Sequence, residues 1–220
     1  PVYFVIFFPE PCPGQTLADV TDAEAEFIRR VAERHPHSQK PVIVGNCQGG
    51  WAVMMLAAAR PETAGPLVIN GAPMSYWSGN DGESPMRYMG GLAGGAWVSL
   101  FAADLGAGKF DGAHLVANFE SLNPANTLWE KWYHLWSNID TERERFLEFE
   151  RWWGGYYLFN EEEIRWIVNN LFVGNKLAWG EARLGPGRFF DLKSIKQPIV
   201  VFASMGDNIT PPQQAFNWIA

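Results

Sequence analysis

The segment VIVGNCQGGWAV, residues 42–53, places a cysteine between glycines directly after a run rich in β-branched residues. The pattern G-x-C-x-G is typical of a nucleophile elbow, in which a strand turns sharply into a helix and presents its reactive side chain. A packing cysteine is the alternative, because free cysteine is among the residues most often buried. The apolar run before Cys47 and the small residues after it favour a catalytic thiol.

The residues around Cys47 fit this interpretation. Gly45 and Gly49 flank it at positions where a side chain would clash with the crossing strand and helix, and Gly50 extends the small surface into the helix. The backbone N–H of Gln48 lies at the predicted helix N-terminus, where it would stabilise an oxyanion. We also expect this N-terminus to lower the pKa of the thiol and favour the thiolate.

The order of the remaining patterns predicts an α/β fold. Continuous apolar runs, expected for parallel strands buried on both faces, cover residues 2–8, 41–44, 65–73 and 197–204. A helix capped by Thr16 and the helix beginning at Gln48 alternate with the first three runs, so we predict a parallel sheet with right-handed crossovers. Phe8 ends the first run, and its backbone N–H is the second candidate oxyanion donor.

Between residues 73 and 191 strand-like runs disappear, and this segment carries nine of the eleven tryptophans. We therefore predict an α/β core with a mostly parallel sheet and an inserted helical lid. The expected division is a first part of the core over 1–73, a Trp-rich lid over 74–190, and a second part of the core over 191–220. The chain opens directly in an apolar run without Met, so we expect a fragment truncated at both ends. Trp129, Trp132 and Trp136 share a helix face, which is more typical of a core than of an acyl-chain site. Their number in a lid also fits an apolar pocket or a partner surface.

A triad of this type runs nucleophile, acid, base along the chain. Asp207 follows the last predicted strand in a turn-rich loop and is the candidate acid, with an ordinary turn as the alternative. All the histidines precede it, so the general base is expected beyond residue 220; they are His35, His37, His114 and His134. Cys12 lies in a proline-rich loop and is not expected to be catalytic. No metal site is predicted, because His, Cys and carboxylates do not cluster at ligand spacing.

Composition excludes several partners. The formal net charge is −7 without a block of like charges, which argues against nucleic acid or an anionic membrane surface as the main partner. No apolar run reaches the roughly 18 residues that a membrane-spanning helix needs. Two cysteines do not form a disulfide framework, so a cytoplasmic location is expected.

Several segments resemble the polyhydroxyalkanoate synthases. They are VIFFPEP, GNCQGGWA, GPLVINGAP, the FDGAHLVANFESLNPANTLWEKWYHLWSNIDTE stretch of the lid, and DLKSIKQPIVVFASMGDNITPPQ. The sequence is closer still to a proteobacterial family of unknown function labelled "poly(3-hydroxyalkanoate) synthetase-like". The resemblance implies an α/β-hydrolase-fold acyltransferase in which Cys47 is the nucleophile and Asp207 orients the catalytic histidine.

This resemblance predicts a Cys-dependent acyltransferase or thioesterase that acts on 3-hydroxyacyl-coenzyme A-like thioesters through an acyl-cysteine intermediate, with no bound cofactor. Homodimerisation or association with polymer granules is possible for such a protein. A Cys hydrolase of esters or lactones, of the dienelactone hydrolase type, is a second interpretation. A third is a catalytically silent domain whose Trp-rich lid binds a partner or a granule surface.

Overall fold

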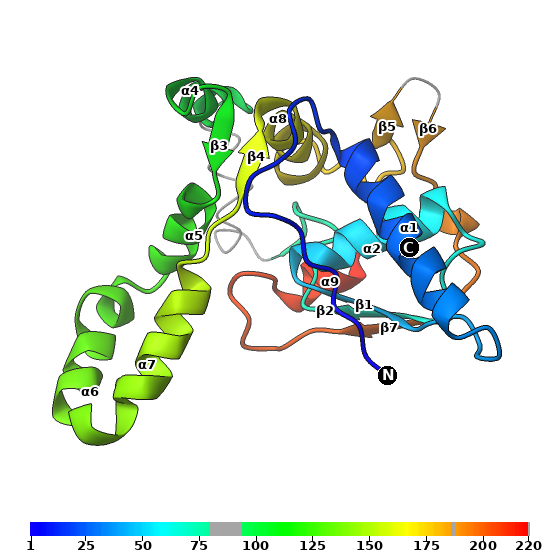
Figure 1. The fold of residues 1–220 in the computed structure, drawn as a ribbon. Coiled ribbons are helices and arrows are strands. Elements are labelled where there is room, and N and C mark those ends of the chain that lie inside the picture. Colours follow the sequence, from blue (N-terminus) through cyan, green and yellow to red (C-terminus); the bar gives the residue numbers. More distant parts are fainter. Residues whose placement is uncertain (80–93, 186–187, 220) are drawn as a thin grey trace.

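The computed structural model describes residues 1–79, 94–185 and 188–219 (Figure 1). The helices are α1 (Leu17–Arg34), α2 (Gln48–Ala59), α4 (Trp97–Leu105), α5 (Ala113–Glu120), α6 (Lys131–Ser137), α7 (Ile139–Trp153), α8 (Glu161–Ile167) and α9 (Pro212–Phe216). The π-helical turns are η1 (Asn126–Glu130) and η2 (Val168–Phe172), and η3 (Leu192–Ser194) is a 3-10 turn. The strands are β1 (Ile43–Asn46), β2 (Leu67–Asn70), β3 (Lys109–Asp111), β4 (Leu158–Asn160), β5 (Arg183–Gly185), β6 (Arg188–Phe189) and β7 (Ile199–Phe202).

A parallel sheet of three strands, in the order β1-β2-β7, positions the candidate site. Ile43, Leu67 and Ile199 lie in register, so the three strands end together at Asn46, Asn70 and Phe202. The connections from β1 to β2 and from β2 to β7 each join neighbouring parallel strands, as the alternation of apolar runs predicted. The α/β class and the parallel sheet are therefore confirmed.

Helices α1 and α2 pack together, and α2 covers one face of the sheet. The side chain of Thr16 caps α1 as predicted, because it accepts a hydrogen bond from the backbone N–H of Asp19, whose carboxylate in turn accepts one from Thr16. Helix α2 is apolar all round, and residues such as Met54 and Ala57 are completely buried. A helix without a polar face belongs in the interior, which is where α2 lies.

Residues 2–8 are not a strand, and this prediction was wrong. The segment lies extended without a ladder to any described strand, and its side chains Val2, Phe4 and Phe8 are 81%, 85% and 88% exposed. An apolar sequence indicates that residues favour burial. It forms a β-strand only where the edge of a neighbouring strand supplies backbone hydrogen bonds. The following residue, Pro9, instead accepts a hydrogen bond from the backbone N–H of Leu158 at the start of β4.

The strands of the parallel sheet were expected to be buried on both faces, and this was also wrong. One face, carrying Gly45, Leu67 and Ile69, packs against α2 and is buried. On the opposite face, Val44 and Phe202 are 64% and 60% exposed in the structure. The strands therefore show the alternating burial of a sheet that is covered on one side.

The middle of the chain is mainly helical, as predicted. The prediction that it contains no strands was wrong. Strands β3 and β4 form one antiparallel pair, and β5 and β6 form another. The segment from α5 through η1, α6 and α7 extends to the left of the sheet as a helical hairpin (Figure 1). The expectation that its tryptophans form a core was wrong, because Trp129, Trp132 and Trp136 are 73%, 50% and 74% exposed.

The proposed lid, residues 74–190, includes residues 80–93 and 186–187, which lie outside the described part of the chain. Its division from the core at 1–73 and 191–220 stays a prediction. Among the helices that the structure describes, none combines the length and the apolarity that crossing a membrane requires.

Helix α1 carries a buried carboxyl group. Glu24 lies on the side of the helix that also carries the buried residues Thr21 and Ile28. Its Oε2 atom is buried, and no described residue forms a hydrogen bond with it. Burial raises the pKa of Glu24 to about 7, because the charged form loses its hydration without gaining a partner.

We predict that Glu24 makes stability depend on pH. Its pKa is raised in the folded state, so folding binds a proton and the free energy of unfolding falls as pH rises from about 4.5 to about 7. The loss is on the order of 3 kcal/mol. Glu24→Gln should remove this dependence, which urea unfolding at about pH 5 and about pH 8 would measure. Glu62→Gln, an exposed control, should keep it; an unchanged pH dependence in Glu24→Gln would contradict the assignment.

Candidate active site

Cys47 lies at the junction of β1 and α2, where the sequence predicted it. Its backbone has φ 52° and ψ −123°, a conformation that non-glycine residues rarely adopt. The backbone N–H of Cys47 donates to the carbonyl of Asn70 at 2.8 Å, which anchors the turn to the end of β2. Strained backbone of this kind is typical of functional sites, because surrounding structure must hold it in place.

The glycines next to Cys47 do not contribute equally. A Cβ atom on Gly45 would lie 2.5 Å from the backbone oxygen of Gly49, and one on Gly50 would lie 2.2 Å from Cβ of Ala72. At Gly49 a Cβ atom would meet nothing within 4 Å. Gly45 and Gly50 therefore have no room for a side chain, as predicted. The same prediction for Gly49 was wrong, since a side chain there would meet open space.

Asp207 lies in the loop that follows β7, and the loop fixes one oxygen of its carboxylate. Asp207 Oδ1 accepts hydrogen bonds from the backbone N–H groups of Ile209 and Thr210, both at 2.9 Å. Within the described residues, no hydrogen bond reaches the second oxygen, Oδ2. A Cβ atom built on Gly71 would lie 3.9 Å from that oxygen, so Oδ2 is directed toward the end of β2.

The same edge of the sheet brings Cys47 and Asp207 together. The N–H of Cys47 is hydrogen-bonded to the carbonyl of Asn70 at the end of β2. Gly71, which follows Asn70, donates its N–H to the carbonyl of Phe202 at the end of β7, at 2.8 Å. Because parallel strands end at one edge, the loops after β1 and β7 meet there across β2. The negative charge of Asp207 also acts on the thiol of Cys47, which places the two groups in one electrostatic environment.

The thiol of Cys47 is harder to ionise than we expected. Burial raises its pKa above the ordinary thiol value, and the charge of Asp207 raises it further. The backbone N–H of Gln48, at the N-terminus of α2, lowers the pKa as predicted, but by less than burial raises it. The prediction of a lowered pKa was therefore wrong, because the helix N-terminus acts against a larger desolvation cost.

Tyr76 belongs to this environment, and the sequence analysis did not identify it. It is buried, and its ring lies 4.9 Å from that of Phe172. Its pKa is raised well above the ordinary value by burial and by the nearby charge of Cys47, whereas the indole of Trp51 lowers it. The only signal in the sequence is its position in the loop after β2, at the edge where Cys47 lies.

Helix α9 holds the loop that carries Tyr76. The carbonyl of Gln214 accepts hydrogen bonds from the backbone N–H groups of Met74 and Ser75 at 3.1 and 2.9 Å. The side-chain amide of Gln214 donates to the carbonyl of Tyr76 at 3.3 Å. The loops after β2 and β7 are thus tied together around Cys47.

Within the described residues, no hydrogen bond or ion pair joins the other candidate residues to Cys47 or Asp207. Phe8 lies in the exposed N-terminal segment, so its oxyanion role stays a prediction. Cys12 is exposed. His35 pairs with the hydroxyl of Tyr3, His114 packs against Phe110, and His134 lies 3.7 Å from Glu142. In the part of the chain that the structure places, none of the four histidines has a hydrogen bond or ion pair with Cys47 or Asp207.

The described residues also offer no obvious metal ligands. Over 1–79, 94–185 and 188–219, no group of three or more His, Cys, Asp or Glu side chains lies close enough to hold a metal ion.

The contrast between two glycines gives a test of the turn. Gly45→Ala should destabilise the protein by about 3 kcal/mol, because the new methyl group would collide with backbone. Gly49→Ala should be neutral or should stabilise by up to about 1 kcal/mol, since alanine favours helix and the space is open. Both values follow from urea unfolding. Equal destabilisation by the two substitutions would contradict the close contact between β1 and α2.

The electrostatic coupling can be tested separately in the 220-residue chain. Asp207→Asn should lower the pKa of Cys47, because it removes a negative charge that opposes ionisation. The rate of alkylation of Cys47 by iodoacetamide at mildly alkaline pH should then rise, since the thiolate is the reacting species. Cys12 in the same chain is the internal control and should react at an unchanged rate. If the rate at Cys47 is unchanged, the two groups are not coupled.

Known proteins resemble this chain over most of its length. An "Uncharacterized protein in ackA 5'region" from Rhizobium meliloti is 58% identical over 218 residues, which is 99% of this chain and 30% of that protein. The "Poly(3-hydroxyalkanoate) polymerase subunit PhaC" of Thiocystis violacea is 27% identical over 180 residues, 77% of this chain and 46% of the relative. The protein of the same name from Synechocystis is 25% identical over 224 residues, 95% of this chain and 56% of the relative.

These matches confirm the resemblance that the sequence motifs indicated, and they show that the relationship to the polymerase subunits is distant. The chain spans about a third to a half of the length of the curated relatives it matches. One family matches residues 1–220 completely. The chain therefore belongs to the family described as "Protein of unknown function (DUF3141)".

Proposed function

We propose that this chain carries the nucleophile and the acid of an acyl-transfer enzyme, with Cys47 and Asp207 in these roles. The observation that carries the proposal is the turn at Cys47, whose φ of 52° presents a thiol at the sheet edge toward which Asp207 Oδ2 is also directed. The distant similarity to polyhydroxyalkanoate polymerase subunits supports a thioester as the substrate. We assign 3-hydroxyacyl-coenzyme A-like thioesters as the substrate class, with no bound cofactor.

The proposed reaction has two steps, acylation of Cys47 and transfer of the acyl group to an acceptor. The thiolate of Cys47 attacks the thioester carbonyl, the bond from that carbon to the carrier sulfur breaks, and the carrier leaves as a thiol with the proton taken from Cys47. The resulting acyl-cysteine is itself a thioester, so the acyl group stays activated. A hydroxyl group, or water in a thioesterase, then attacks it and returns a proton to Cys47.

A general base is needed in both steps. The pKa of Cys47 is raised by burial, so little thiolate forms at neutral pH without one. Asp207 Oδ2 could accept a hydrogen bond from an imidazole N–H and hold that ring toward the thiol. In the described residues none of the four histidines forms a hydrogen bond or ion pair with Cys47 or Asp207, and we propose a histidine outside residues 1–220 as the base.

Backbone N–H groups would stabilise the negative charge that develops on the carbonyl oxygen. Gln48 lies at the first position of α2, and its N–H already lowers the pKa of the adjacent thiol. An N–H group that favours the thiolate also favours an oxyanion at the same helix N-terminus. Phe8 is proposed as the second backbone donor.

A catalytically silent binding domain is the second candidate. The observation that favours it is the exposed aromatic surface of the helical hairpin, where Trp129, Trp136 and Trp152 are 73%, 74% and 70% exposed. Exposed aromatic clusters often mark surfaces for a protein partner or an apolar phase. This role and catalysis at Cys47 are separable, because the substitutions that test them lie on different elements.

The proposal predicts the behaviour of the full-length protein toward 3-hydroxyacyl-coenzyme A. Cys47→Ala should abolish release of free coenzyme A thiol, whereas Cys12→Ala should leave most of it. Asp207→Asn should lower kcat by about 10²- to 10⁴-fold, because the base loses its orientation. Thiol release is followed with a chromogenic disulfide.

The Asp207→Asn variant distinguishes a role in orienting the base from an effect on the pKa of Cys47 alone. Asp207→Asn raises the thiolate fraction of Cys47 and should still lower the turnover rate. Wild-type turnover by Cys47→Ala would show that Cys47 only packs. If no variant of the full-length protein, wild type included, releases thiol, the silent binding domain is the better interpretation.

A further inference from the structure

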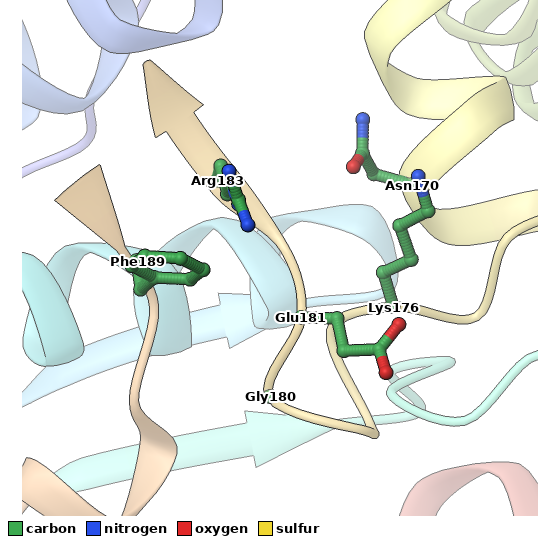
Figure 2. A pocket seen from close by; sticks show the side chains of 6 residues that line it. All are labelled: Asn170, Lys176, Gly180, Glu181, Arg183 and Phe189. Carbon is green, nitrogen blue, oxygen red and sulfur yellow. The ribbon is translucent and has the colours of Figure 1, made fainter. Parts of the chain in front are cut away.

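A cavity of about 530 Å³ opens beside the β5–β6 strand pair, and Cys47 is not among the residues that line it (Figure 2). Its volume lies in the range of roughly 300–1,000 Å³ that is usual for small-molecule pockets. The residues that line it are Asn170, Lys176, Gly180, Glu181, Arg183 and Phe189. Two of the six are cations, in a chain whose formal net charge is −7.

The guanidinium of Arg183 lies over an aromatic ring. It lies opposite Phe189 in the antiparallel pair, and its guanidinium carbon is 4.3 Å from the centre of that ring. Stacking fixes the plane of the guanidinium and leaves its N–H edge free to donate two parallel hydrogen bonds. Among the residues that the structure describes, no carboxylate forms an ion pair with Arg183.

Lys176 supplies the second positive charge from a constrained loop. Its backbone N–H donates to the carbonyl of Asn170 at 2.7 Å, and its carbonyl accepts from the N–H of Glu181 at 2.8 Å. In Figure 2 the side chain of Lys176 extends toward that of Asn170. No ion pair involving the ammonium group occurs in the described ranges, so the charge is available to a ligand.

One residue that lines the cavity, Glu181, carries a negative charge that would repel an anionic ligand. Glu181 is exposed and places a carboxylate at the cavity, although in Figure 2 it points away from Arg183. The two cations outnumber it, so the cavity keeps a net positive charge. Glu181 therefore weakens the attraction for an anion without reversing it.

We propose that this cavity binds the phosphate groups of a nucleotide-bearing thioester carrier of the coenzyme A type. The proposal rests on the function proposed above, since it names the part of the substrate that is held away from Cys47. Two unpaired cations suit a group with more than one negative charge, and an Arg fork matches phosphate oxygens. The cavity is larger than a lone phosphate needs, and the ring of Phe189 in its lining is 51% exposed.

The cavity is connected to the Cys47 environment through packed rings. The loop between Lys176 and Glu181 also carries Trp179, whose ring lies edge-on at 5.3 Å from that of Trp77. Trp77 follows Tyr76, the buried residue on which the charge of Cys47 acts. The loop that lines the cavity therefore packs against the loop that carries Tyr76.

The test is calorimetric titration of the full-length Cys47→Ala protein with adenosine 3′,5′-bisphosphate, which cannot be turned over. Replacing both cations, Lys176→Ala with Arg183→Ala, should weaken binding roughly ten- to a hundredfold, because charge-assisted hydrogen bonds are lost. Glu181→Gln should tighten binding about two- to fivefold, because it removes a like charge. Arg143→Ala, an exposed cation on α7 that does not line the cavity, is the matched control and should change nothing.

Several results would overturn the proposal. These are no binding, equal affinity in the double variant, or weaker binding in Glu181→Gln. Inorganic pyrophosphate that binds as tightly as the bisphosphate would exclude a nucleotide carrier. Failure of the proposed function is distinguishable, because it shows as absent turnover in active Cys47 protein while these binding differences persist. With turnover present, the double variant should raise KM for the thioester and leave kcat unchanged.

Discussion

The close approach of strand β1 and helix α2 is the constraint on which the rest of the site depends. Gly45 has backbone atoms of Gly49 and Gly50 where a side chain would begin, and Cys47, between them, has a φ of 52°. The hydrogen bond from Cys47 N–H to Asn70 then fixes the turn to β2. The thiol is placed at the sheet edge by packing of the backbone rather than by its own contacts.

That placement has an electrostatic cost. The helix N-terminus at Gln48 favours the thiolate, but burial and the carboxylate of Asp207 oppose it more strongly. A site of this kind is inert at rest and becomes nucleophilic only when a base removes the proton. The open oxygen of Asp207, with its other oxygen held by Ile209 and Thr210, is suited to position such a base.

The sequence allowed prediction of the features that depend on local patterns. The β-branched runs, the capping of α1 by Thr16, the turn at Cys47 and the loop position of Asp207 all follow from neighbouring residues. What failed depends on contacts between distant residues. Segment 2–8 is apolar but forms no ladder with a described strand, and Trp129 and Trp136 stay largely exposed although Trp132 packs against Phe146 of α7. The strands β3 to β6 are too short to give a periodic signal, and the burial of Glu24 and Tyr76 arises only from tertiary packing.

The two proposed sites divide one substrate between them, with chemistry at Cys47 and recognition of the carrier at Arg183 and Lys176. The most direct measurement of the central claim is mass spectrometry of the full-length protein after brief incubation with 3-hydroxyacyl-coenzyme A and an acid quench. The account predicts an acyl group, removable by hydroxylamine, on the peptide that contains Cys47 and not on the one that contains Cys12. Thiol release without any adduct on Cys47, or an adduct on another residue, would contradict it.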